Sequence, residues 1–175
     1  MYTGPVLDQP LAIELHNTLY AGGDGLTDAR AWLEAVAGKL PVAPGAIDLA
    51  RLDELIALRG AVREALHAAR EGRPIPAAAV AELNGRSAGS PRSEMLEQTV
   101  ARVRHHGPTA TDIVLGEIAA SAITLVSSAS SDLRVCGAPR CVLMFVKDHP
   151  RREWCSAACG NRARQARHYA RTRGR

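Results

Sequence analysis

Hydrophobic residues recur at helical spacing through most of the first 130 residues. The clearest pattern runs from Asp48 to about Glu71, with apolar residues at Leu49, Leu52, Leu55, Ile56, Leu58, Val62 and Leu66. Spacing of three and four residues predicts a long amphipathic helix. Gly72 and Pro74 follow, and these are the residue types that end helices.

Three further helices are predicted on either side of the long one. The first begins at Thr27 or Asp28, a capping pair, and its apolar positions reach Leu40. The second opens at Pro76 and closes at Asn84 and Gly85, before a loop over residues 87–91. The third runs from Thr109 or Thr111 to about Ser130.

Two segments leave the choice between helix and strand open. Residues 11–19 fit a short strand or the first turn of a helix, and residues 93–106 fit one face of a helix or a strand. The fold class predicted is mainly α, and a few short strands are compatible with it. His16 and Asn17, in the first of these segments, are interpreted as making local hydrogen bonds or a cap.

The pattern changes after the serine-rich run at residues 127–131, which we take as the boundary between a helical domain, 1–130, and a small module, 131–175. Val142–Val146 predicts a strand, 148–150 a turn, and 151–154 an antiparallel return strand. From Ser156, alanines and arginines fall on different faces of a predicted basic helix.

Composition indicates where the protein is located and which kinds of side chain form its core. Every apolar run is well short of about 18 residues, so no membrane span is predicted. The start of the chain lacks the features of a secretory leader, which predicts a cytoplasmic protein. Only six residues are aromatic, which indicates an aliphatic, helical core and no stacking platform for single-stranded bases.

Charge is distributed unevenly. Residues 134–175 carry ten Arg and one Lys against two acidic residues, a net charge of +9, whereas residues 1–133 carry −5. A basic tail on a neutral-to-acidic domain indicates a polyanionic partner. The arginines expected to contact it are Arg151, Arg152, Arg162, Arg164, Arg167 and Arg171.

All four cysteines lie within 24 residues, as two close pairs: Cys136 with Cys141, and Cys155 with Cys159. Such pairs bring four thiolates to one tetrahedral ion, which predicts Zn²⁺ held by all four. Two disulfides would need an oxidising compartment, and neither pair has the C-x-x-C spacing of a thioredoxin-type redox site. Redox-active or inert thiols remain as alternatives.

A closed site of four thiolates has no coordination position for water or substrate, so it stabilises a fold and does no chemistry. The sequence also lacks a P-loop, a nucleophile motif and G-x-G-x-x-G. We therefore expect a binding protein and not an enzyme.

The cysteine pattern and the Cys-Gly-Asn-Arg tetrapeptide at residues 159–162 resemble the CGNR zinc finger. The preceding part, with Leu-Ala-Ile-Glu-Leu-His-Asn-Thr at residues 11–18, is similar to the ABATE domain. The resemblance implies a mainly helical bacterial regulator of transcription, responsive to stress, with the four cysteines as zinc ligands and Gly160, Asn161 and Arg162 as the signature. The segment at 147–150 is shorter than the hairpin of many members, and Glu153 separates the arginines from Trp154.

The predicted function is a zinc-dependent nucleic-acid-binding regulator, with DNA favoured over RNA. A small molecule or protein is expected as effector of the helical domain. A homodimer is compatible with this function, since regulators that read half-sites commonly pair. The alternatives are an RNA-binding protein and a zinc-stapled module for protein interaction.

Overall fold

The computed structural model describes residues 2–173, so residue 1 and residues 174–175, at the outer ends of the two predicted domains, lie outside it. Within residues 2–173, six α-helices carry the fold: α1 (Leu11–His16), α2 (Ala29–Ala35), α3 (Leu52–Arg70), α4 (Ala77–Gly89), α5 (Ala110–Ser128) and α6 (Ala157–Arg173). Three two-stranded antiparallel ribbons accompany them: β1 (Leu19–Tyr20) with β2 (Gly23–Asp24), β3 (Arg92–Glu97) with β4 (Val100–His105), and β5 (Leu133–Val135) with β6 (Met144–Val146). The predicted mainly α fold is confirmed.

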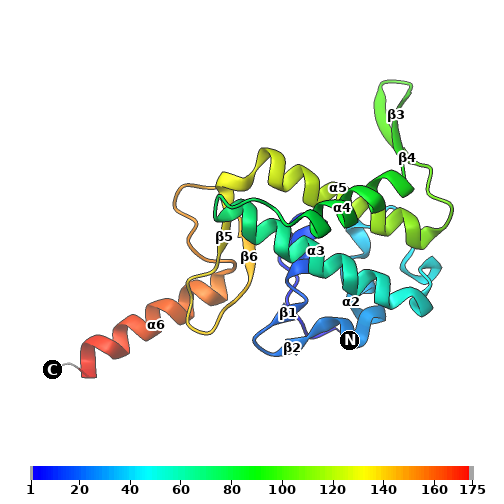
Figure 1. Cartoon of the computed structure of the whole chain (residues 1–175). Helices are drawn as coiled ribbons and strands as arrows, with labels where there is room; N and C mark the ends of the chain where they lie inside the picture. Colours follow the sequence, from blue (N-terminus) through cyan, green and yellow to red (C-terminus); the bar gives the residue numbers. More distant parts are fainter. Residues whose placement is uncertain (1, 174–175) are drawn as a thin grey trace.

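Five of the helices form one bundle, which we call the body (residues 2–132). Helices α3, α4 and α5 pack against one another, and α1 packs on α3 and α5 (Figure 1). The hydrophobic side chains at the centre of the bundle are aliphatic apart from one indole; those fully buried include Ile13, Leu15, Trp32, Leu33, Leu58, Leu66 and Ile118.

The ends of the long helices follow from their flanking residues. Asp48 caps the 3-10 turn Leu49–Arg51 that leads into α3, accepting a hydrogen bond from the N–H of Ala50 at 2.9 Å. Gly72 follows α3 with φ of +65°, the left-handed conformation that ends many helices. Thr109 caps α5 by accepting from the N–H of Asp112. The helices predicted at 48–71 and 109–130 are thus confirmed to within a few residues.

Helix α5 is long and apolar enough, by length and composition, to cross a membrane. In the structure it is the helix that α1, α3 and α4 all contact, and Ile118, Ala119 and Ala122 are fully buried. This central position in the bundle accounts for its apolar character.

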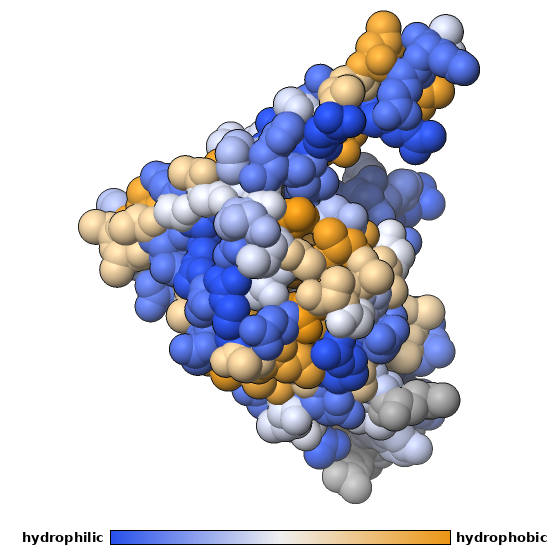
Figure 2. All heavy atoms as spheres, turned by 90° about the vertical axis from the view of Figure 1, so that its right-hand side faces the viewer, coloured by the Kyte–Doolittle hydropathy of each residue, from blue (hydrophilic) through white to orange (hydrophobic). Residues whose placement is uncertain are grey.

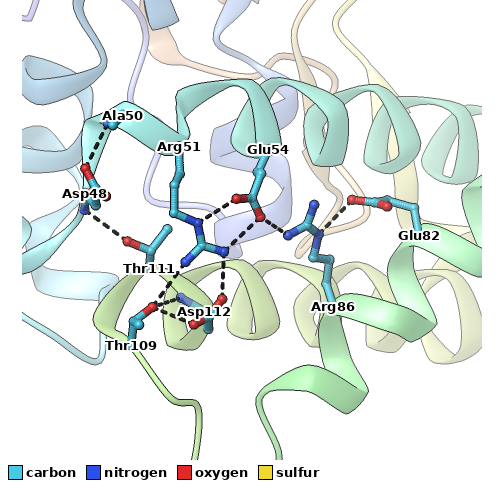
Figure 3. Close-up of polar contacts among 9 residues, drawn as sticks. All are labelled: Asp48, Ala50, Arg51, Glu54, Glu82, Arg86, Thr109, Thr111 and Asp112. Atoms are coloured by element: carbon cyan, nitrogen blue, oxygen red, sulfur yellow. Dashed lines mark hydrogen bonds and ion pairs between the residues drawn. The ribbon is translucent and has the colours of Figure 1, made fainter.

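Ion pairs join helices α3, α4 and α5 (Figure 3). Arg51, just before α3, donates to Glu54 at 2.9 Å and to Asp112 of α5 at 2.8 Å. Arg86 of α4 donates to the same Glu54 and to Glu82. Hydrogen bonds from the two guanidinium groups lower the pKa of Glu54 to about 2, so this carboxylate stays charged in mild acid.

One prediction in the middle of the chain needs correction, and one choice left open by the sequence is decided. Helix α4 does not close at Asn84 and Gly85 but continues to Gly89, through most of the predicted loop. Burial of Leu83 and the ion pairs of Arg86 hold this segment against the bundle, which outweighs the low helix propensity of glycine. Residues 93–106, left open, are mostly a β-hairpin with Gln98 in a left-handed turn conformation.

The C-terminal module (residues 133–173) begins with the β5–β6 hairpin and ends with α6, which projects from the molecule (Figure 1). The predicted strand at Val142–Val146 exists from Met144 onward, but its partner is Leu133–Val135 and not the predicted return strand at 151–154. Leu133 and Met144 are fully buried in the same hydrophobic core as the helices of the body, and this burial selects the upstream partner.

Candidate functional site

The four cysteines occupy two turns of the C-terminal module. Cys136 directly follows β5, and Cys141 lies in the turn that leads back to β6. A 2.9 Å hydrogen bond from the Cys136 N–H to the Leu143 carbonyl closes this turn. Cys155 precedes α6, and Cys159 lies in its first turn.

The four sulfur atoms converge, with all Sγ atoms within 4.8 Å of one another. The Sγ atoms of Cys141, Cys155 and Cys159 are 3.4–3.8 Å apart. A tetrahedral ion with metal–sulfur bonds of about 2.3 Å requires sulfur–sulfur separations of about 3.8 Å. None of the four forms a disulfide, and three are buried, Cys141 being partly accessible. The donor set and its spacing fit a metal site.

Hydrogen bonds to sulfur hold these side chains in place. The N–H of Cys155 points at Cys136 Sγ at 3.5 Å, and the N–H of Leu143 donates to Cys141. Arg162 Nη2 donates to Cys159 Sγ at 3.0 Å. Such outer contacts orient ligands and partly neutralise a tetrathiolate centre.

Burial disfavours negative charge on these thiols unless a cation is bound beside them. Burial raises the pKa of Cys141 to about 11 and raises that of Cys155 further. Burial also acts to raise the pKa of Cys159, but hydrogen bonds from Ser156 and the neighbouring cysteines outweigh it and lower the value. Four thiolates can therefore share this space only around a positive ion, which would displace the remaining protons on binding.

The signature residues have distinct structural roles. A Cβ atom on Gly160 would lie 2.9 Å from Cδ1 of Trp154, so only glycine leaves room for the indole against the first turn of α6. Asn161 Oδ1 accepts a hydrogen bond from Arg164, while Arg162 supports a cysteine sulfur. The tetrapeptide thus links the metal cluster to the basic helix.

Gly160→Ala should push Trp154 out of its position. The overlap should cost about 1–3 kcal/mol of stability, as overpacking does, and change the tryptophan emission maximum. Urea unfolding and fluorescence would measure both. Gly85→Ala is the matched control, because a Cβ there meets nothing within 4 Å. Equal emission spectra for the wild type and Gly160→Ala would contradict the proposed contact.

The predicted arginines fall into two groups. Arg164, Arg167 and Arg171 line a surface hollow of about 380 Å³ with His168. Arg164 also borders a second hollow, of about 450 Å³, together with Arg151, Arg152 and Trp154. The Arg167 guanidinium lies over the Trp154 ring at 5.9 Å. One side of α6 therefore presents a continuous cationic surface with an indole in it.

Arg152 and Arg162 are engaged inside the module. Arg152 donates to Asp148 at 2.7 Å and to the carbonyl of Cys155 at 3.2 Å, and its guanidinium lies over Phe145. Arg162 donates to Cys159. Both guanidinium groups therefore also hold parts of the module together.

A polar contact between body and module was not predicted from the sequence. Asn17 Nδ2 donates to the carbonyl of Met144, and the N–H of Met144 donates to Asn17 Oδ1, both at 2.9 Å. Next along β6, the N–H of Val146 donates to Gln9 Oε1 at 2.7 Å. Two side-chain amides thus occupy the free edge of β6 in place of a strand. The only signal in the sequence was the polar His-Asn pair inside an apolar segment.

His16 orients Asn17. Burial, followed by the charge of Arg63, lowers the pKa of His16 to about 3, so its ring is neutral. The His16 Nδ1 lies 3.1 Å from Asn17 Oδ1, and its Nε2 lies 3.2 Å from Nε2 of His67. A consistent proton arrangement has His67 donating to His16, and His16 donating to Asn17.

Comparisons with known proteins agree with this anatomy. Residues 9–129 match the ABATE family, described as "putative stress-induced transcription regulator". Residues 133–172 match the CGNR zinc finger. Among curated proteins, no match is found. The ABATE match covers more than half of the 175 residues, and with it the resemblance seen in the sequence is confirmed: the chain belongs to the ABATE family and carries a CGNR zinc finger.

Proposed function

We propose that Cys136, Cys141, Cys155 and Cys159 hold one Zn²⁺ and that the module so formed binds duplex DNA through α6. Zinc is the ion that four-cysteine sites most often hold in structural modules. Bound there, it would stabilise the fold and leave no position for substrate. The protein is then a regulator and not an enzyme, in keeping with the description of its family.

The observation that carries the proposal is the uncompensated charge on one side of α6. Arg164, Arg167 and Arg171 form no ion pair with any carboxylate among the residues that the structure describes. The helix begins at the metal cluster and projects from the body (Figure 1). An exposed helix of this kind can approach phosphates. The indole ring of Trp154, in the hollow beside the helix, offers a flat surface for contact next to them.

An effector would act where body and module meet. An open pocket of about 350 Å³ lies between the N-terminal segment, Tyr20 and the turn of Cys141, with Arg140 and Arg162 among its lining residues. A small molecule there would contact both parts of the chain, and this is where we propose that an effector binds.

Salt dependence tests the DNA proposal. If the helix neutralises about four phosphates, log affinity for a labelled duplex should fall with log salt at a slope of about −3 to −4. Arg167→Ala/Arg171→Ala should make that slope shallower by about 2 and weaken binding across sequences. Fluorescence anisotropy of the zinc-loaded full chain would measure both.

The matched control is Arg70→Ala/Arg73→Ala, which removes the same charge from the end of α3. It should leave the slope unchanged. A flat salt response, or an equal loss in the control, would refute binding through α6. Competition with an RNA duplex of the same sequence distinguishes the two nucleic acids, and absence of binding to either would favour a protein partner.

A further inference from the structure

The cysteine sulfurs of this chain lie at one end of the molecule. All four belong to the C-terminal module, on the side from which α6 projects (Figure 1). The opposite side, seen in Figure 2, carries the β3–β4 hairpin and shows hydrophobic atoms interspersed with polar ones. Any thiol chemistry of this protein is therefore confined to the cluster of cysteines.

The four sulfurs of the cluster differ in their access to solvent. Cys136, Cys155 and Cys159 are buried, with 3–5% of their surface exposed, whereas Cys141 is partly exposed. Cys141 lines the open pocket of about 350 Å³ between body and module, and Cys159 borders the same pocket. Cys155 borders the hollow on the Trp154 side instead. A small molecule that enters the pocket thus meets Cys141 first.

The surroundings of Cys141 favour its reaction as a nucleophile. A cysteine that holds a metal ion is deprotonated, and the thiolate is the nucleophilic form. Arg140 and Arg162 line the pocket, whereas no carboxylate of the described residues does. Guanidinium groups at such a place stabilise the negative charge that develops on a leaving oxygen.

A second sulfur lies close enough to form a disulfide with Cys141. Cys159 Sγ is 3.7 Å from Cys141 Sγ, and a disulfide bond measures about 2.05 Å, so a movement of about 1.7 Å would join them. Arg162 Nη2 donates to Cys159 Sγ at 3.0 Å, which favours the thiolate form of Cys159. An accessible thiolate beside a second cysteine is the arrangement typical of redox-sensitive sites.

We propose that Cys141 is an oxidation site for hydrogen peroxide and that it closes a disulfide with Cys159, which releases the metal ion. Oxidation would thereby control α6, which begins at this cluster. The inference rests on the zinc site proposed above and does not depend on DNA binding.

Two displacements account for the atoms and electrons. In the first, Cys141 Sγ forms a bond to one peroxide oxygen and the O–O bond breaks; the leaving hydroxide takes a proton and becomes water. In the second, Cys159 Sγ forms a bond to Cys141 Sγ and the S–O bond breaks; this hydroxide also takes a proton and leaves as water. The two thiolates lose two electrons to one peroxide. Two of the four metal ligands are then lost, so the ion should dissociate.

Zinc release from the full chain tests the proposal. Metal analysis should first find one zinc ion per chain. Excess hydrogen peroxide should then release that ion to a zinc-binding dye, and mass spectrometry should find a Cys141–Cys159 disulfide. Dimedone, which traps sulfenic acids, should label Cys141 when it is added together with the peroxide. First labelling at another cysteine, or a disulfide that joins any other pair, would overturn the proposal.

Two tryptophan substitutions that keep all four cysteines test entry through the pocket. Ala158 lines the pocket of Cys141, whereas Ala157, the neighbouring exposed position, borders the hollow beside Trp154. Ala158→Trp should slow zinc release by about tenfold, because it covers the accessible thiolate. Ala157→Trp is the matched control and should leave the rate unchanged. Equal rates for the two variants, or a slower Ala157→Trp, would contradict attack at Cys141.

The same experiment separates this inference from the proposed zinc site. A protein that holds no zinc before peroxide is added would refute the metal site and overturn the inference with it. Zinc that is bound at the start and retained through complete oxidation of Cys141 would leave the metal site standing and overturn the inference alone.

Discussion

Removal of the proposed Zn²⁺ should unravel α6 and the turns that hold the cysteines, while the body keeps its fold. The module outside the shared core is small: around the cysteines, Ala138, Leu143, Phe145 and Ala163 supply most of its buried apolar surface. A helix of this length is marginal by itself in water. Structural zinc contributes about 10–16 kcal/mol to the folding of comparable modules, so its loss should be decisive.

Hydrogen exchange with and without a chelator would test this result. Amides of residues 157–172 should lose protection, whereas those of α3 and α5 should change little, and added Zn²⁺ should restore the original pattern. Cys155→Ser should reproduce the effect without a chelator. Unchanged protection of α6 after complete removal of the metal would show that packing alone holds the module.

Asn17→Ala should destabilise the protein by about 2–6 kcal/mol. Asn17 is fully buried and makes two hydrogen bonds to the backbone of Met144. Its truncation leaves a buried N–H and a buried carbonyl without partners, and each such group costs about 1–3 kcal/mol. The free energy of unfolding in urea measures the loss.

Two further variants provide comparisons for the loss of unfolding free energy in Asn17→Ala. Gln9→Ala removes a single acceptor from the same edge of β6 and should cost about half as much. Asn161→Ala removes an exposed amide and should change stability by no more than about 0.5 kcal/mol. An Asn17→Ala protein as stable as the Asn161→Ala protein would contradict the role given to Asn17.

Features that depend on local sequence were predictable. The amphipathic pattern gave α3, the Thr109 cap gave α5, and paired spacing identified the cysteines that converge at one point. In each case the residues that decide the structure are close in the sequence, so their periodicity or spacing carries the information.

Features that depend on distant contacts were not predictable. The partner of β6 is chosen by burial of Leu133 and Met144 among the helices of the body. The bonds of Asn17 to Met144 span 127 positions. Continuation of α4 to Gly89 depends on Arg86 reaching Glu54 of another helix. No local sequence pattern encodes such contacts between distant residues, so they cannot be predicted from a single sequence.

The burial of Leu133 and Met144 among the helices limits how the protein can be divided. The C-terminal module cannot be moved to another protein without loss of buried contacts. A chain cut after residue 130 would lose two side chains from the interior of its helical part, and a transplanted module would expose the same two to water. Chimaeras between relatives should therefore exchange both parts together, or carry α1 along with the strand that rests against it.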